Sequence, residues 1–205
     1  MPVLGKTKKD VVQEFRTSEI LAAARSEFAS KGFANATVDG IADRAGVAKG
    51  TVYLYFSSKN DLFLELLRQG ILELHENARR EINAATDARG KLRAFLHARI
   101  EYCSRNRDFF RIYYTEFLRM QARMAGERPE FQDLYEEQAR LLESILQAGI
   151  VSGQFCIFDV HKVARLTYEV IRAAVAQHVL EWPDNAVEDT TELTLGIILG
   201  GIGCR

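Results

Sequence analysis

The sequence lacks the features that would place the chain in or across a membrane. No apolar run in its 205 residues reaches the ~20 residues that a membrane-spanning helix needs. The first ten residues, MPVLGKTKKD, contain lysines without the apolar stretch that follows the charges of a secretory signal. A hydrophobic content of 47% is typical of a globular protein. We therefore expect a soluble cytoplasmic protein of one or two domains.

Cysteine is scarce, and histidine is scattered. Cys103, Cys156 and Cys204 form no C-x-x-C pair, which favours reduced thiols over a disulfide framework or a zinc site. The four histidines contain no H-x-x-x-H pair, and the chain has no G-x-S-x-G, phosphate loop or dinucleotide fingerprint. We therefore expect no metal, no cofactor and no catalytic activity.

Charge is nearly balanced overall but unevenly distributed. The net charge of −1 shows that the chain as a whole is not a polycation. Residues 1–60 carry nine Lys+Arg and six Asp+Glu, whereas the remainder carries 18 and 22. A basic N-terminal part on an acidic body agrees with local contact to phosphates. The asymmetry is small, and a solvated surface would explain it equally well.

The most informative stretch is residues 37–59, TVDGIADRAGVAKGTVYLYFSSK. It is typical of two short helices joined by a glycine turn. Thr37 can cap the first helix, and Gly46 can end it in the left-handed conformation. The second helix would turn Val52 inward and Tyr53 outward. Two helices joined in this way form a helix-turn-helix, whose second helix can enter a DNA major groove.

This stretch resembles the DNA-reading segment of the tetracycline-repressor (TetR) family of bacterial transcription regulators. The matching residues are Thr37-Val38, Ile41-Ala42, Ala45-Gly46-Val47, Lys49-Gly50-Thr51-Val52-Tyr53, Tyr55-Phe56 and Ser58-Lys59. The resemblance is specific for residues 17–59 and architectural for the rest. It implies six DNA-contacting positions, namely Thr37, Lys49, Gly50, Thr51, Tyr53 and Lys59.

Some positions depart from the family pattern or leave their role open. Ala48 stands where a serine often caps the recognition helix, and Leu54 stands where a histidine often approaches the DNA backbone. The recognition helix has no arginine to contact guanine, so DNA shape should contribute to recognition. Gly40 costs ~1 kcal/mol against alanine inside a helix. Sequence drift, close approach to a neighbour, or close approach to DNA would each explain this glycine.

The patterns predict an all-α protein of about nine helices. A three-helix helix-turn-helix domain, residues 1–58, should precede a helical effector-binding and dimerisation domain, residues 59–205. Residues 1–16 should form a flexible arm that either reaches DNA or only solubilises the chain. The first helix should cover residues 18–31, and the fourth should run from the Ser58–Asp61 capping motif to about residue 83. The later helices should cover residues 88–104, 108–124, 130–148, 160–181 and 187–201.

A stripe of aromatic residues lies on the predicted helix 108–124. It would form either ordinary core or an apolar pocket in which phenols and a guanidinium orient a small molecule. TetR-family proteins bind effectors within this body, so the resemblance implies a pocket. The candidate lining residues are Arg99, Tyr113, Phe117, Tyr168 and Arg172. Arg172 would meet an anionic effector, pair with an acidic neighbour, or lie at a dimer surface.

The two C-terminal helices, residues 160–181 and 187–201, look dimer-forming because they are apolar and the second is glycine-rich. In the family, the matching helices of two subunits form a four-helix interface. We therefore predict a dimeric repressor that binds a palindromic operator and is released by a hydrophobic or aromatic effector. An alternative is a helix-turn-helix regulator whose body binds a protein partner or no effector. The sequence does not distinguish a repressor from an activator.

Overall fold

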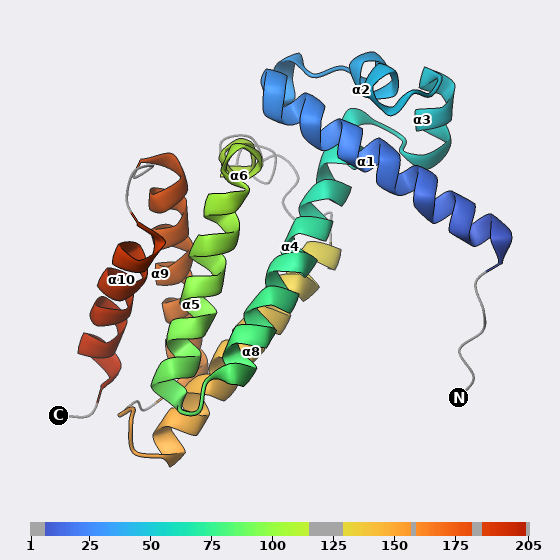
Figure 1. Cartoon of the computed structure of the whole chain (residues 1–205). Helices are drawn as coiled ribbons and strands as arrows, with labels where there is room; N and C mark the ends of the chain where they lie inside the picture. The colour runs from blue at the N-terminus through green and yellow to red at the C-terminus, as the bar shows by residue number, and fades with distance from the viewer. Residues whose placement is uncertain (1–6, 115–128, 157–158, 182–185, 204–205) are drawn as a thin grey trace. The chain divides into compact units, whose positions relative to one another are not determined.

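The computed structural model describes residues 7–114, 129–156, 159–181 and 186–203, and over these residues the chain is all-α, as predicted (Figure 1). The nine described helices are Lys8–Asn35 (α1), Val38–Ala45 (α2), Lys49–Tyr55 (α3), Lys59–Ala84 (α4), Ala88–Arg105 (α5), Arg107–Ile112 (α6), Pro129–Val151 (α8), Val160–Leu180 (α9) and Val187–Ile202 (α10). The described part contains one isolated β-bridge, between Phe155 and Gly203. Along these helices, none is both long enough and apolar enough to cross a membrane.

The chain divides into two compact units, Met1–Gln69 and Gly70–Arg205. The division lies inside α4, whereas the sequence led us to expect a boundary after residue 58. The first turns of α4 belong to the first unit because their apolar side chains complete its core. Leu62 and Phe63 are fully buried, and the Phe63 ring packs edge-on against Phe28 at 5.6 Å between centroids.

The first helix begins earlier than the sequence suggested. Residues 7–16 were expected to belong to a flexible arm, but α1 begins at Lys8. Thr7 and Asp10 form a capping box in which each side chain binds the other residue's backbone N–H, and this local motif starts the helix before the apolar stripe begins. Gly32 has a φ of 72° and interrupts the helix where the sequence predicted its end.

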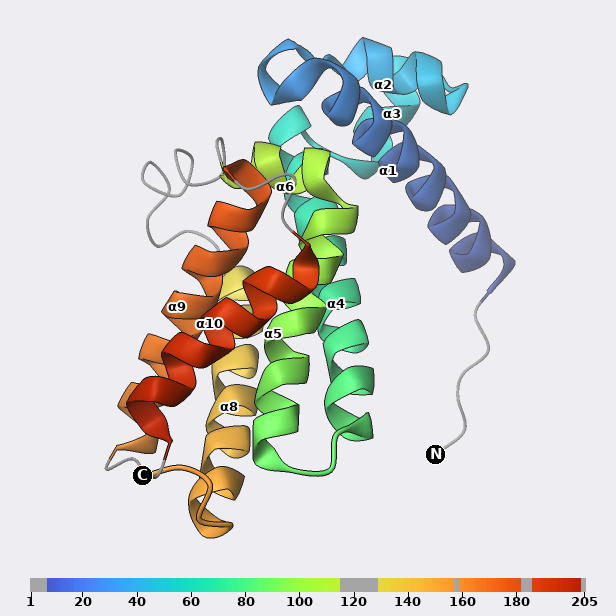
Figure 2. The same cartoon turned by 60° about the vertical axis from the view of Figure 1, so that its left-hand side comes forward.

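The second unit is a bundle of helices around α5. This helix contacts α8, α9 and α10, and Figure 2 shows α4 running beside it. Leu92, Phe95, Leu96 and Ile100 of α5 are fully buried and form the centre of the bundle. Arg99 and Tyr102 are buried among them, so this core is not wholly apolar.

The cysteines differ from expectation at one position. Cys103 is a free thiol buried in the bundle, in line with the prediction of reduced thiols. Cys156 is disulfide-bonded, so that prediction is wrong at this residue. Scattered spacing along the sequence gave no signal for this bond because disulfide pairing depends on proximity in the fold. Cys204 lies outside the described residues.

Candidate nucleic-acid interface and effector site

Helices α2 and α3 form the predicted helix-turn-helix in the first unit (Figure 1). Thr37 caps α2, because its Oγ1 accepts the N–H of Gly40 at 3.0 Å. Gly46 ends α2 with φ 65° and ψ 32°, and the N–H of Val47 returns to the carbonyl of Ala42 at 3.0 Å. This pairing is a Schellman motif, which fixes where the chain turns towards α3. The turn chemistry therefore sets the angle at which α3 leaves α2.

One face of the recognition helix α3 packs into the first unit, and the other face is exposed to solvent. Val52 is fully buried, whereas Tyr53 keeps 48% of its surface exposed and Lys49 and Gly50 are also exposed. Thr51 is half-buried. No side chain caps the helix start at Ala48, as its departure from the family pattern predicted. Helix α3 thus presents a lysine, a glycine and a phenol on one surface of the first unit.

Lys49 is held by an exposed ion pair. Its Nζ lies 2.8 Å from Oδ2 of Asp39, and this hydrogen bond raises the pKa of Lys49. Both side chains are at least half exposed, so the pair can exchange with other ions at little cost. Lys49 therefore remains able to turn towards a phosphate.

Lys59 makes structural contacts within the first unit. Its ammonium group donates to three backbone carbonyls at the C-terminal end of α1, those of Phe33, Ala34 and Ala36, at 2.8, 3.2 and 2.9 Å. It also lies 4.7 Å above the Phe33 ring. All three donors of the ammonium group are engaged. The predicted DNA contact of Lys59 stays a prediction, and any loss at this position would also act on the fold.

Gly40 lies close to a neighbour within the protein. A methyl group at this position would overlap the carboxylate of Glu27 and lie 2.9 Å from its Cδ. Glu27 is fully buried and forms ion pairs with Lys31 and Arg44, each at 2.7 Å. The hydrogen bond from Lys31 and the contacts with Arg44 outweigh burial and lower the pKa of Glu27. Close approach to this carboxylate explains the glycine without invoking DNA.

The second unit brings most of the predicted effector-site residues together. The guanidinium of buried Arg99 lies 5.9 Å from the Tyr168 ring, and that of Arg172 lies 5.9 Å from the Tyr135 ring. The rings of Tyr135 and Tyr168 are 6.5 Å apart. The hydroxyls of Tyr135 and Tyr113 are 2.5 Å apart. Tyr135 therefore links the other four residues into one cluster, and Phe117, also predicted, lies outside the described residues.

Arg172 meets an acidic neighbour, which was one of the three alternatives for this residue. Its Nη1 lies 2.9 and 3.0 Å from the two carboxylate oxygens of Glu169 on the same helix. Its side chain is partly exposed. Arg172 thus has a carboxylate partner, whereas the cluster's other cation, Arg99, is buried.

Three polar residues of this cluster were not predicted as site residues. They are Tyr135, Gln138 and His75, and the last two are buried. Gln138 falls on the apolar face of α8 with Leu142 and Ile145, and His75 falls on that of α4 with Ile71 and Ala78. The signal in the sequence that could have found Gln138 and His75 is a polar residue at a core position of an otherwise apolar helical stripe.

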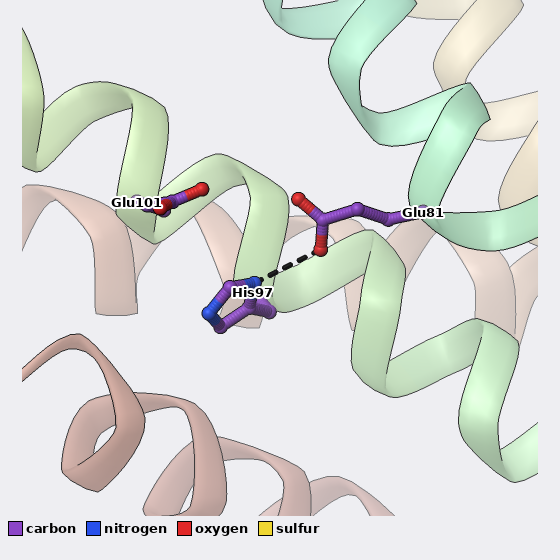
Figure 3. Close-up of side chains that lie close together, drawn as sticks. All are labelled: Glu81, His97 and Glu101. Atoms are coloured by element: carbon purple, nitrogen blue, oxygen red, sulfur yellow. Dashed lines mark hydrogen bonds and ion pairs between the residues drawn. The ribbon is translucent and has the colours of Figure 1, made fainter. Parts of the chain in front are cut away.

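One further cluster joins α4 to α5. Figure 3 shows Glu81 of α4 facing His97 and Glu101 of α5, with Nδ1 of His97 2.9 Å from Oε2 of Glu81. Among the described residues, each of these three could offer one ligand atom to a metal ion, and the three ligand atoms lie within 4.8 Å of one another. They are partly exposed, and Glu101 already pairs with Arg105 at 2.6 Å. The His97–Glu81 contact links α5 to α4, and the Glu101–Arg105 pair lies within α5.

Comparisons with known proteins agree with this architecture. Residues 20–66 match the family described as bacterial regulatory proteins, tetR family. The transcriptional repressor KstR2 of Mycolicibacterium smegmatis is 31% identical over 192 residues, which cover 91% of this chain and 90% of KstR2. The transcriptional activator FasR of the same organism is 34% identical over 99 residues, or 48% of this chain and 45% of FasR. These relatives are transcription regulators.

A solved structure shows the same fold at lower identity. The transcriptional regulator FadR from Bacillus subtilis, in complex with stearoyl-CoA, superposes with a TM-score of 0.73 at 23% identity. The superposition covers 90% of this chain and 98% of that one. The likeness includes the body as well as the helix-turn-helix unit.

Proposed function

This chain belongs to the TetR family of DNA-binding transcription regulators, and from this premise we propose that it is a repressor that binds a palindromic operator as a dimer and is released by a small-molecule effector. The observation that carries the DNA contact is the outward face of α3, with Lys49 and Tyr53 exposed beside Gly50. Phosphate contacts would supply most of the affinity, and contacts to base edges would supply specificity. We propose no catalytic role, and we place the protein in the cytoplasm with its DNA.

A dimer through α9 and α10 is supported by the apolar side chains that these helices expose. Leu166 of α9 and Leu193 and Ile197 of α10 are 69%, 57% and 63% exposed, although each is large and apolar. Gly196 and Gly200 of α10 have open space where a side chain would stand. Exposed apolar surface of this kind is typical of an interaction site, and small residues allow helices to approach closely. A two-fold dimer would carry two copies of α3 to a palindromic site.

An effector site in the body is supported by the cluster around Arg99 and Tyr168. Phenols and a guanidinium beside buried aromatic rings match the usual make-up of a small-molecule site. The Bacillus subtilis FadR structure with stearoyl-CoA is a precedent for a ligand with a long apolar chain in a protein of this fold. We propose a hydrophobic or aromatic effector for this chain. A body that binds a protein partner, or nothing, is the alternative.

Helix α4 gives a route from effector to DNA. It runs from Lys59 to Ala84, and the chain's two units divide within it. An effector that binds one setting of α4 more tightly than another would change the fraction of dimers able to bind the operator. A coupling of roughly 1–3 kcal/mol, usual for allosteric proteins, would change operator affinity by about 5- to 150-fold.

Selection of bound duplexes from random DNA tests this proposal, because the selection itself identifies the operator sequence. We expect enrichment of a palindrome whose half-sites are about one helical turn apart. A reporter gene placed behind the selected site should be repressed when the protein is expressed. If a palindrome is enriched but the reporter is activated, only the repressor assignment is overturned. If no sequence is enriched, the operator proposal is overturned. If no small molecule changes operator affinity, the result favours the alternative, in which the body binds a protein partner or no effector.

A further inference from the structure

The body contains a buried positive charge whose contacts within the described residues include no anion. Arg99 is 5% exposed, and its Nη1 donates to the carbonyl of Phe95 at 2.9 Å. Its Nη2 donates to Oε1 of Gln138. Its remaining neighbours are the Phe95 ring, 3.5 Å from the guanidinium, and the Tyr168 phenol, with the Cys103 thiol nearby. Over this part of the chain, no carboxylate pairs with Arg99.

The groups around Arg99 remain uncharged at neutral pH, whereas Arg99 remains charged. Burial lowers the pKa of Arg99 to about 10, so the guanidinium keeps its proton at neutral pH. Burial raises the pKa of the Cys103 thiol and of the Tyr168 phenol, so both also keep theirs. A buried charge without a partner is strongly unfavourable. Bidentate pairing with a carboxylate or phosphate is the arrangement that guanidinium geometry favours.

Two more polar atoms of the same neighbourhood are unsatisfied. Nε2 of Gln138 is buried and has no hydrogen-bond partner. Because arginine can only donate, Oε1 of Gln138 must face Arg99, which leaves the amide N–H groups as free donors. Nδ1 of buried His75 also has no partner. Burial and the charge of Arg99 lower the pKa of His75 to about 3, so its ring is neutral and can donate one hydrogen bond. Unpaired buried polar atoms are rare in folded proteins and call for an explanation.

We propose that the effector carries a carboxylate, that Arg99 and the Gln138 amide bind this group, and that the aromatic side chains beside them receive an apolar body. This inference rests on the proposed effector function and adds the chemistry of the recognised group. Arg99 supplies the charge and Gln138 a further donor from the facing helix. The Tyr113–Tyr135 hydroxyl pair and the Tyr168 ring continue the site away from the charge. Retention of a buried charge at the expense of stability is typical of a binding site.

The test uses calorimetric titration of the full-length protein with three acids of different shape: decanoate, cholate and 1-naphthoate. Each acid is paired with its methyl ester, which keeps the body and removes the charge, and decanoyl-CoA is included as a thioester. We expect saturable binding of at least one acid and at least tenfold weaker binding of its ester. Arg99→Met should weaken binding of that acid at least tenfold and leave binding of the ester unchanged. Arg99→Lys should restore only part of the affinity because a lysine cannot make the bidentate contact.

A control variant and a stability measurement separate recognition from folding. Arg105 lies exposed at the end of the same helix. The control variant Arg105→Gln should therefore leave acid binding unchanged. Without ligand, Arg99→Met should unfold at the same temperature or higher, since it removes an unpaired buried charge. Gln138→Leu is a second variant that tests the same site. It should bind the acid more weakly while it remains folded.

Several outcomes would overturn the proposal. They are equal affinity for acid and ester, unchanged acid binding in Arg99→Met, binding of decanoyl-CoA alone, binding of no acid at millimolar concentration, and a lower unfolding temperature in Arg99→Met. A carboxylate that binds through Arg99 but leaves operator affinity unchanged would instead refute effector control. The carboxylate site would then stand without the regulatory function.

Discussion

At the scale of single residues, Gly40 and Gly50 form a matched pair of helical glycines in different surroundings. Gly40 faces the buried carboxylate of Glu27, whereas a methyl group at Gly50 would meet nothing within 4 Å. We expect Gly40→Ala to lower the free energy of unfolding by about 1–3 kcal/mol, the usual cost of overpacking, because Glu27 cannot move without breaking its ion pairs. Gly50→Ala should raise it by up to ~1 kcal/mol through helix propensity. Urea unfolding of both variants measures the two effects.

For operator affinity we expect the larger direct effect at Gly50, the reverse of the order expected for stability. If Gly50 allows close approach to the DNA backbone, Gly50→Ala should weaken operator binding in a protein that is no less stable. Gly40→Ala should change operator binding only as far as it unfolds the first unit. Equal stability losses in the two variants would contradict the packing that the structure shows.

His75 gives a residue-scale prediction about pH. Its folded pKa of about 3 lies below the ordinary value of 6.5, so below pH 6.5 the unfolded state binds a proton that the folded state does not. This histidine should therefore reduce stability as the pH falls from 6.5 towards 3, with a limiting slope of roughly 1.4 kcal/mol per pH unit. Urea unfolding between pH 7 and pH 4.5 should show a shallower decline for His75→Leu than for the wild type. Parallel curves would show that His75 is not buried neutral.

At the scale of elements, α3 and the start of α4 contribute different things to DNA binding. Tyr53 is exposed, so Tyr53→Ala should weaken operator binding, by roughly 1 kcal/mol or more if the phenol makes one phosphate hydrogen bond. Its unfolding temperature should stay unchanged. Lys59→Ala removes three hydrogen bonds to carbonyls at the C-terminal end of α1, so it should destabilise the fold by roughly 1.5–3 kcal/mol. Both variants should remain dimers.

Fluorescence anisotropy with the selected operator and thermal unfolding together separate these effects. Operator affinity that stays unchanged in Tyr53→Ala would refute the contact assignment on α3. A Lys59→Ala variant as stable as the wild type would refute the structural role of that lysine.

The sequence predicted some elements closely because their signals are local. The bounds of α2 follow from Thr37, Gly46 and the apolar positions between them. The start of α1 was missed because the Thr7–Asp10 capping box extends the helix beyond its apolar stripe. The links between site residues are not local: Tyr135 joins the cluster only when α8 packs beside α5 and α9. A buried Gln138 or His75 can be suspected from helical periodicity, but its partners follow only from the packing.

At the scale of the whole molecule, the account depends on a dimer through α9 and α10. Ile197→Asp places a charge in the centre of the exposed apolar face of α10 and should dissociate the dimer. Val151→Asp changes a side chain that is also exposed and apolar, at the end of α8, and serves as the control. Analytical ultracentrifugation should show monomers for the first variant and dimers for the second. A dimeric Ile197→Asp variant would move the interface elsewhere.

Loss of the dimer should also cost operator affinity. A monomer would contact one half-site, so the Ile197→Asp variant should bind a palindrome no better than a single half-site. Unchanged preference for the palindrome would show that dimerisation does not set operator choice.

The most direct test of the central claim is an anisotropy titration of the purified protein with DNA flanking its own gene, repeated at several salt concentrations beside a scrambled duplex of equal length. The account predicts tight binding of one dimer to a palindromic segment, at least a thousandfold above the scrambled duplex at physiological salt. Both affinities should fall as salt rises, because phosphate contacts release counterions. If the operator lies elsewhere, the duplex selected from random DNA takes the place of the flanking DNA. Equal affinity of that duplex and its scrambled counterpart at every salt concentration would contradict the claim that this chain reads a specific operator.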